Sequence, residues 1–366
     1  MAGFARVKLN ESVWEFPDVY EIVRPLGFGS FGQVARVRLR GAQIGDVAMK
    51  KLVQPFDREE DAKGAYREIR LLKHMNHRNV ISLLHVFHPP ARGGDFQNVY
   101  FVTQLMDEDL HRFTRSNRIT DYQIRSILYQ ILRGLKYIHS AGVLHRDLKP
   151  SNIAVNQNIE VRILDFGLAR LSSMIMSDFV GTLWYRAPEL LFLRGSYTNA
   201  IDIWSVGCIL AEMITGHALF PGNGYLNQLE CLLNIMGTPS QEFTGGIHVE
   251  HSHKYLERYP YREKQDFYQL FPNANPQALD LMEKMLEMVP ERRITADDAM
   301  LHPFLRDLIE PHHGVEDIAP AYDQNFENIV LPVKCWRELL SHEIDNFQPP
   351  PFYVDALRIA YDQQQH

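Results

Sequence analysis

The spacing of hydrophobic and polar positions divides the chain into two parts. In the first hundred residues the apolar runs are short: residues 34–39 alternate apolar and polar side chains, and residues 47–49 and 99–102 are brief apolar runs. One helical stretch interrupts them at about residues 58–75, where Ala65, Ile69, Leu72 and Met75 recur every three or four positions. The pattern predicts a small β-rich part that contains one helix.

After Met106 the pattern becomes helical, most strongly over residues 121–140 and again over residues 201–214 and 278–286. We therefore predict an α+β, bilobal fold, with a β-rich N-terminal lobe over residues 1–105 and a helical C-terminal lobe over residues 106–309. Beyond Glu310 the chain is richer in proline and polar residues, with three prolines at 349–351. Residues 310–366 are predicted to be an extension that packs back on the lobes.

Composition excludes several classes of protein. A chain of 366 residues that is 45% hydrophobic and 23% charged is typical of a globular protein with two or three domains or lobes. The net charge of −7 lacks the basic footprint of a nucleic-acid binder. We expect no signal peptide, and no apolar run reaches the ~18 residues that a membrane span needs. Three scattered cysteines, Cys208, Cys231 and Cys335, favour a reducing compartment over a disulfide framework or zinc site.

Residues 27–34 are typical of a glycine-rich phosphate-binding loop. Glycine lets the backbone turn tightly and bring its N–H groups close to phosphate oxygens. An ordinary hairpin would also explain these glycines. A Rossmann-type dinucleotide fold would require a helix directly afterwards, but another strand pattern follows here, which disfavours that alternative.

A lysine ends the next apolar run. Lys50 follows Val47-Ala48-Met49 and could reach the anionic oxygens of a nucleotide, if a carboxylate holds its side chain in place. Glu68 on the following helix is a candidate for that carboxylate, although a surface salt bridge is an equally fair interpretation of Glu68 alone.

The segment from His145 to Asn152 concentrates polar and turn-forming residues between two apolar runs. Because burying so many polar groups costs free energy, a purely structural role is improbable. Asp165 follows a further apolar run at residues 161–164. A carboxylate and the Asn152 amide would suit Mg²⁺, which prefers oxygen ligands.

In this order and spacing the motifs resemble those of the eukaryotic protein kinases, from about Tyr20 to Phe304. Further matches are Ala187-Pro188-Glu189, the stretch from Asp202 to Gly207, and Arg293. The resemblance implies transfer of a phosphoryl group from ATP to a protein hydroxyl, with Mg²⁺.

The resemblance also assigns roles to single residues. Asp147 would accept the proton of the substrate hydroxyl, Lys149 would neutralise the moving phosphoryl group, and Lys50, paired with Glu68, would hold the ATP phosphates. Asn152 and Asp165 would hold Mg²⁺. The implied ATP-binding residues are Gly27, Phe28, Gly29, Ser30, Phe31, Gly32, Gln33, Val34, Ala48, Lys50, Thr103, Gln104, Met106 and Ala154.

Within the kinases, residues 66–75, residues 184–189 and an insert at about 238–276 resemble the MAP kinases. The tail motif at residues 322–327 is similar to that of the stress-activated p38 subfamily, in the form of a divergent insect-type paralogue. The resemblance implies a monomeric, cytoplasmic and nuclear serine/threonine kinase with a preference for proline after the target residue. Its partners would be protein substrates, upstream MAP kinase kinases and phosphatases, without nucleic acid or membrane.

The activation segment, residues 165–189, departs from the family pattern. Where those kinases carry Thr-Gly-Tyr, this chain has Ser177, Asp178 and Phe179, and phenylalanine has no hydroxyl to phosphorylate. Two of the arginines that hold the loop phosphates in the family are replaced, by Leu183 and Gly64. The remaining phosphate-binding positions are Arg67, Arg146 and Arg186. We hypothesise that activation no longer depends on tyrosine phosphorylation.

The docking region also departs from the family. Its acidic patch corresponds to residues 310–317, with Glu310, Glu316 and Asp317 beside two histidines, and a second acidic pair is replaced by Gln157-Asn158. We expect basic docking peptides to bind weakly, and more weakly when the histidines are protonated below about pH 6.5.

An alternative class is a pseudokinase that acts as a scaffold. Only the altered activation segment favours it. Against it, the residue types that phosphoryl transfer requires are all present, at Lys50, Glu68, Asp147, Lys149, Asn152 and Asp165. The sequence therefore favours an active enzyme.

Overall fold

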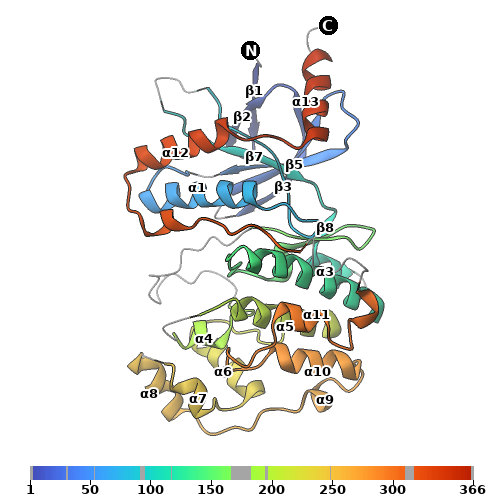
Figure 1. The fold of residues 1–366 in the computed structure, drawn as a ribbon, viewed down its shortest axis with the longest axis vertical. Helices are drawn as coiled ribbons and strands as arrows, with labels where there is room; N and C mark the ends of the chain where they lie inside the picture. The colour runs from blue at the N-terminus through green and yellow to red at the C-terminus, as the bar shows by residue number, and fades with distance from the viewer. Residues whose placement is uncertain are drawn as a thin grey trace. The chain divides into compact units, whose positions relative to one another are not determined.

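The computed structural model describes residues 3–29, 32–52, 54–90, 95–116, 118–165, 183–193, 197–247, 249–309 and 317–363. The chain divides into two compact units, drawn in Figure 1. The first comprises Met1–Asn76, Ile81–Leu105 and Asp323–His366, and the second comprises His77–Val80 and Met106–Tyr322. The first is built on a β-sheet and the second mainly on helices, so the predicted α+β class is confirmed.

The first unit contains a five-stranded antiparallel sheet. Its strands, in spatial order, are β3 (Tyr20–Gly29), β4 (Gly32–Leu39), β5 (Asp46–Leu52), β7 (Tyr100–Gln104) and β6 (Leu83–Phe87). Val34 lies opposite Lys50, whereas Ala35 lies opposite Met49. Because successive side chains point to opposite faces of a strand, these two pairs mark the two faces of the sheet. The face that carries Ala35 and Met49 is part of a buried hydrophobic core.

A hairpin and the last helix cover this hydrophobic face. The hairpin consists of β1 (Phe4–Leu9) and β2 (Ser12–Pro17), and the helix is α13 (Pro351–Gln363). Asn10 and Glu11 both have left-handed φ angles, 46° and 65°, as a tight two-residue hairpin turn requires. From α13 the fully buried Tyr353 reaches the hydroxyl of Tyr20 at 3.0 Å.

On the other side of the first unit, α1 (Glu59–His74) and α12 (Val333–Asp345) run side by side (Figure 1). Their contact is aromatic: the Tyr66 ring lies 5.5 Å from Trp336, and 5.2 Å from Phe326 of the short helix η3 (Asn325–Asn328). Helix α1 matches the helix predicted at about residues 58–75. Two helices in the proline-rich tail were not predicted. The prolines made the start of α13 look non-helical in the sequence. Pro351 nevertheless fits its first turn, because the first N–H groups of a helix have no intrahelical acceptor and proline lacks that N–H.

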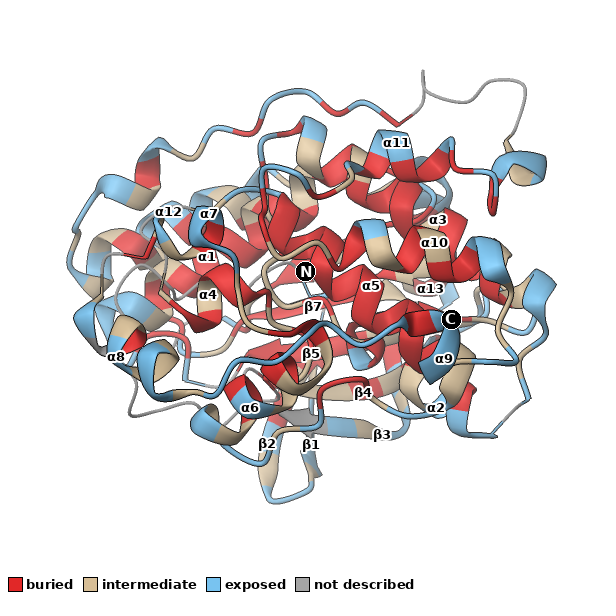
Figure 2. Ribbon diagram, turned by 90° about the horizontal axis from the view of Figure 1, so that it is seen from below, coloured by how far each residue is buried: buried red, intermediate tan, exposed pale blue. Residues whose placement is uncertain are grey.

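The second unit is organised around α3 (Asp121–Ser140), α5 (Ala200–Thr215) and α10 (Pro276–Met285), at or near the predicted ranges. Helix α3 begins at Thr120 because Thr120 and Gln123 form a capping box. Figure 2 shows α3 and α5 as mostly buried, and α5 is buried almost all round. A buried ion pair between Arg293 and Glu189, 2.7 Å apart, fixes α4 (Pro188–Leu191).

The remaining elements of the second unit are short. Its three-stranded sheet consists of β10 (Val161–Ile163), β9 (Ile153–Val155) and β8 (Glu108–Asp109). The other helices are α2 (Leu110–Ser116), η1 (Pro150–Asn152), α6 (Tyr225–Met236), α7 (Gln241–Thr244), α8 (Glu250–Arg258), α9 (Phe267–Leu270), α11 (Ala296–Met300) and η2 (Arg306–Leu308).

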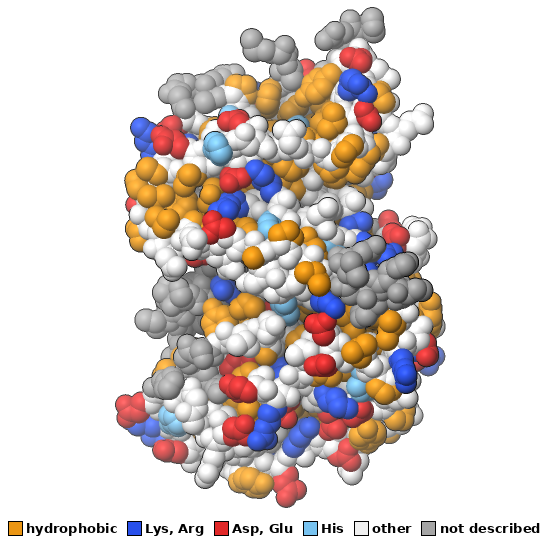
Figure 3. All heavy atoms as spheres, viewed as in Figure 1, with side chains coloured by type: hydrophobic (Ala, Val, Ile, Leu, Met, Phe, Trp, Pro, Cys, Tyr) orange, Lys and Arg blue, Asp and Glu red, His pale blue; other side chains and the backbone are white. Residues whose placement is uncertain are grey.

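The surface is mixed in character. On the face shown in Figure 3, acidic and basic side chains are interspersed with hydrophobic ones. None of the helices among the described residues has both the length and the apolar character that crossing a membrane requires.

Candidate active site

In the first unit the structure brings Lys50 and Glu68 together. The Lys50 ammonium on β5 donates to the Glu68 carboxylate on α1 at 2.7 Å, and their side chains are only 11% and 6% exposed. A charged pair buried this far requires close contact, because each charge has lost its water. The carboxylate therefore fixes the position of the ammonium, on the face of the sheet that also carries Val34.

The glycine-rich segment forms the turn between β3 and β4, where Gly29 lies opposite Gly32. A Cβ atom at Gly32 would lie 2.7 Å from the carbonyl oxygen of Lys51, so only glycine fits there. Ala48, opposite Thr103, shares the Lys50 face. Of the predicted ATP-binding residues, Ser30, Phe31 and the Phe28 side chain lie outside the described part of the chain.

In the second unit a polar loop between α3 and β9 holds Asp147. The Asp147 Oδ2 atom accepts hydrogen bonds from the Lys149 ammonium at 2.7 Å and from the Asn152 amide at 3.0 Å. The same Asn152 nitrogen donates to the backbone carbonyl of Asp147 at 2.9 Å. The Asp147 side chain is nevertheless 45% exposed, so its carboxylate is both held in place and accessible to a substrate.

Beneath this loop lies Asp202, a buried carboxylate at the start of α5. It accepts hydrogen bonds from the backbone N–H groups of His145 and Arg146, at 2.9 and 2.8 Å, and from the His139 ring at 2.9 Å. Burial alone would raise the pKa of Asp202, but these bonds outweigh it and hold the pKa below its usual value. They also stabilise the left-handed backbone of Arg146, whose φ is 69°.

The two predicted metal-binding residues are brought close by one neighbour. The Leu164 N–H donates to the Asn152 carbonyl, and the His145 ring donates to the Leu164 carbonyl, both at 2.8 Å. Leu164 directly precedes Asp165, which is exposed and has a left-handed φ of 46°. Because the Asn152 NH₂ donates to Asp147, its amide oxygen is the atom that would be left to bind a cation. A carboxylate and an amide oxygen fit Mg²⁺, which keeps several of its own waters.

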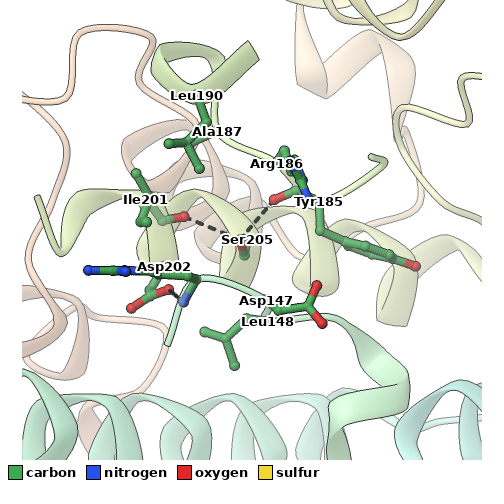
Figure 4. A pocket seen from close by; sticks show the side chains of 10 residues that line it. Asp147, Leu148, Tyr185, Arg186, Ala187, Leu190, Ile201, Asp202 and Ser205 are labelled. Atoms are coloured by element: carbon green, nitrogen blue, oxygen red, sulfur yellow. Dashed lines mark hydrogen bonds between the residues drawn. The ribbon is translucent and has the colours of Figure 1, made fainter. Parts of the chain in front are cut away.

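Beside Asp147 the second unit has a small pocket (Figure 4). Its apolar lining comes from Leu148, Ala187, Leu190 and Ile201. The Ser205 hydroxyl at its edge donates to the Tyr185 carbonyl at 2.8 Å. Its cavity volume is about 10 Å³, which is room for about one water molecule.

The predicted phosphate-binding arginines have different surroundings. In the first unit, the buried Arg67 donates two hydrogen bonds to the Glu327 carboxylate. In the second unit, the Arg146 guanidinium lies 5.6 Å from the centre of the Tyr197 ring. Arg186 is half-buried; burial lowers its pKa, and the nearby Asp147 acts in the opposite direction. Leu183 is buried. The predicted regulatory residues Ser177, Asp178 and Phe179 lie outside the described residues.

The placement of Asp317 corrects one prediction. We expected Asp317 in a surface docking patch, but it is fully buried and accepts hydrogen bonds from the His77 ring at 3.0 Å and from Arg133 at 2.9 Å. Burial would raise the pKa of Asp317, but these partners outweigh it and lower the pKa to about 2. A docking peptide cannot reach this carboxylate. Glu310 and Glu316 lie outside the described residues.

Sequence reasoning missed the functions of Asp202 and Asp317, and a signal for each existed. Asp202 is an acidic residue at the start of a long apolar helix. Burying its charge there costs free energy unless polar groups bond to it, so such partners could have been expected. Arg133 lies between buried positions of α3 and therefore requires an anionic partner from elsewhere in the chain.

Comparison with known proteins gives a consistent result. Residues 20–305 match the protein kinase domain. The chain is 70% identical over 350 residues to the putative mitogen-activated protein kinase 14C of Drosophila melanogaster, covering 95% of this chain and 98% of that protein. It is 50% identical to the mitogen-activated protein kinase p38a of the same species, with 97% of each chain covered. It is 46% identical to mitogen-activated protein kinase 14 of Xenopus laevis, with 95% of this chain and 96% of that protein covered.

Proposed function

The chain belongs to the protein kinase family, as a serine/threonine kinase of the p38 MAP kinase kind, and we propose that it phosphorylates protein substrates at Ser-Pro and Thr-Pro sites through Asp147. The observation that carries this proposal is the arrangement around Asp147, whose carboxylate is oriented by Lys149 and Asn152 while it remains accessible.

Asp147 acts as the proton acceptor. Its fixed carboxylate accepts the hydroxyl proton of the substrate as the hydroxyl oxygen bonds to the γ-phosphorus of ATP, the bond from that phosphorus to the β–γ bridging oxygen breaks and ADP leaves. The Lys149 ammonium offsets the negative charge of the group in transfer. Lys50, fixed by Glu68, binds the ATP phosphates. Asn152 and Asp165 would hold Mg²⁺, which would supply positive charge to neutralise phosphate oxygens. We assign ATP and Mg²⁺ to the site on these grounds.

The preference for proline rests on the similarity of the chain to the p38 MAP kinases. Proline has no backbone N–H, so no donor is left without a partner when the residue after the target is enclosed. The test is phosphate transfer from ATP to two peptides that differ only in Ser-Pro or Ser-Ala. We expect the Ser-Pro peptide to be the better substrate, and equal rates would contradict the preference.

Activation is proposed to be independent of tyrosine phosphorylation. Phe179 cannot carry a phosphate, and the buried Leu183 replaces an arginine that binds the phosphotyrosine in the family. Losing the anion and one of its receptors together avoids an unbalanced cluster of positive charge. On this proposal the loop is ordered by phosphorylated Ser177, by Asp178 or by packing of Phe179, or it is not ordered at all.

Docking is proposed to be weak. With Asp317 buried, Glu310 and Glu316 are the two carboxylates left in the predicted patch, beside His312 and His313. Upstream kinases, phosphatases and substrates with basic docking segments would therefore bind with reduced affinity in the cytoplasm and nucleus. Affinity for a basic peptide should fall between pH 7.5 and pH 6, and an unchanged affinity would count against this docking proposal.

A further inference from the structure

We propose that the β1–β2 hairpin positions the glycine-rich strand β4 from behind, through a hydrogen bond from the Trp14 indole to the Gln33 side chain. On this proposal, which rests on the proposed function, Trp14 and Gln33 are positioning residues for ATP binding. The Trp14 Nε1–H group donates to the Gln33 Oε1 atom at 3.0 Å.

The strand register places this bond directly behind the nucleotide face. Gln33 lies opposite Lys51, and the next pair along the strands is Val34 opposite Lys50. Since side chains alternate between the faces of a sheet, Gln33 and Lys51 point toward the hairpin while Val34 and Lys50 point the other way. The Gln33 side chain, which we predicted to be among the ATP-binding residues, therefore bonds to the hairpin and not to the nucleotide. Gln33 and Lys51 are therefore each adjacent in the chain to a residue, Val34 or Lys50, that is predicted to contact ATP.

Strand β2 of the hairpin is attached to three strands of the sheet. Besides the bond to Gln33 on β4, the Lys51 ammonium on β5 donates to the Ser12 hydroxyl at 2.9 Å and to the Val13 carbonyl at 2.7 Å. On β7, the Tyr100 hydroxyl accepts from the Glu15 N–H at 3.1 Å. Three separate attachments hold the hairpin in one position relative to the sheet.

Trp14 is a rigid anchor in this arrangement. It is fully buried, and its ring lies 5.7 Å from that of Tyr100. Gln33 is half-buried and follows Gly32, a residue with more backbone freedom than any other type. A bond from a fixed indole to this point restricts the start of β4, so that less conformational entropy is lost when a nucleotide binds. The effect belongs to nucleotide affinity, because Asp147 and Lys149 are not involved.

The test compares Trp14→Phe, which keeps a buried aromatic ring without the donor, with Gln33→Met, which keeps the length without the acceptor. We expect the Kd for Mg-ATP to rise about threefold to tenfold in each variant, as the loss of one hydrogen bond predicts. The Kd for Mg-ATP of the double variant should be no higher than that of either single variant, because both substitutions remove the same bond. In Trp14→Phe the effect should lie in KM for ATP and not in kcat.

A second measurement needs no nucleotide. Hydrogen exchange of the β4 amides from Val34 to Leu39 should be faster in both variants than in the unchanged protein. The matched control is Tyr100→Phe, which removes another attachment of the same hairpin without touching β4. We expect the control to leave the Kd for Mg-ATP unchanged.

The outcomes separate the two proposals. Unchanged Kd and unchanged β4 exchange in Trp14→Phe and Gln33→Met would overturn the positioning role, as would fully additive effects or an equal rise in Kd in Tyr100→Phe. If the unchanged protein does not bind Mg-ATP, the proposed function fails instead, and β4 exchange still tests whether the bond orders the strand.

Discussion

Asn152 holds Asp147 at two points. One amide nitrogen donates to the backbone carbonyl of Asp147 at 2.9 Å and to its carboxylate at 3.0 Å. The backbone contact fixes where Asp147 lies and the side-chain contact fixes how its carboxylate points. Asn152 thus has two proposed functions, because its amide oxygen is also assigned to Mg²⁺.

Asn152→Ala should lower kcat by about 100-fold at saturating ATP, Mg²⁺ and peptide. The reason is that a displacement of a reacting group by about 1 Å costs rates of this order. Steady-state kinetics of peptide phosphorylation measures it. Asn158→Ala is the matched control, because Asn158 is an exposed asparagine in the turn after β9. A kcat for Asn152→Ala within a factor of two of that of the unchanged protein would contradict the role assigned to Asn152.

Asp317→Asn should destabilise the folded protein by about 3 kcal/mol at pH 7, because it leaves Arg133 buried without its anion. The pKa of Asp317 is about 2 in the folded protein, against 3.8 for a free carboxyl. A carboxyl with a lowered pKa stabilises the fold above about pH 4, and this contribution is lost as the pH falls toward 2.

Urea unfolding at pH 7 and at pH 3 measures this difference. The difference in the free energy of unfolding between Asp317→Asn and the unchanged protein should be smaller at pH 3 than at pH 7. Asp307→Asn is the control, because Asp307 forms a surface pair with Arg125 and is 81% exposed. An equal difference in the free energy of unfolding at both pH values would show that the charge of Asp317 does not stabilise the fold.

Phe179→Tyr, treated with an upstream dual-specificity kinase, should be no more active than the unchanged protein given the same treatment. A tyrosine phosphate at position 179 would lack the arginine that Leu183 replaces. Mass spectrometry establishes that the new tyrosine is phosphorylated, and peptide phosphorylation then gives the rate. Strong activation that tracks the tyrosine phosphate would refute the proposal that this chain has lost that control.

The sequence predicted best what local patterns determine. Helix α3 could be placed from its apolar stripe, and Thr120 with Gln123 explains why it begins where it does. The residues from His145 to Asn152 could be found because so many polar groups between apolar runs require a chemical reason. In both cases the deciding interactions lie within a few residues of each other along the chain.

Contacts between distant segments could not be predicted in the same way. Asp317 looked like one more acid in a polar tail, because its partner Arg133 is 184 residues away. The bond between Trp14 and Gln33 leaves no periodic signal, since it depends on how the hairpin lies on the sheet. Helix α13 was hidden by its prolines, although Tyr353 and Ala356 show the spacing of a buried helical face.

The central claim is that this protein is an active kinase in which Asp147 accepts the proton. The most direct measurement is transfer of the γ-phosphate of ATP to a Ser-Pro peptide by the unchanged protein and by Asp147→Asn. We predict steady transfer by the unchanged protein and a loss of at least about 100-fold in Asp147→Asn, with ATP affinity preserved. Equal rates in the two proteins, or no transfer by either after treatment with an upstream kinase, would contradict the account and favour a scaffold.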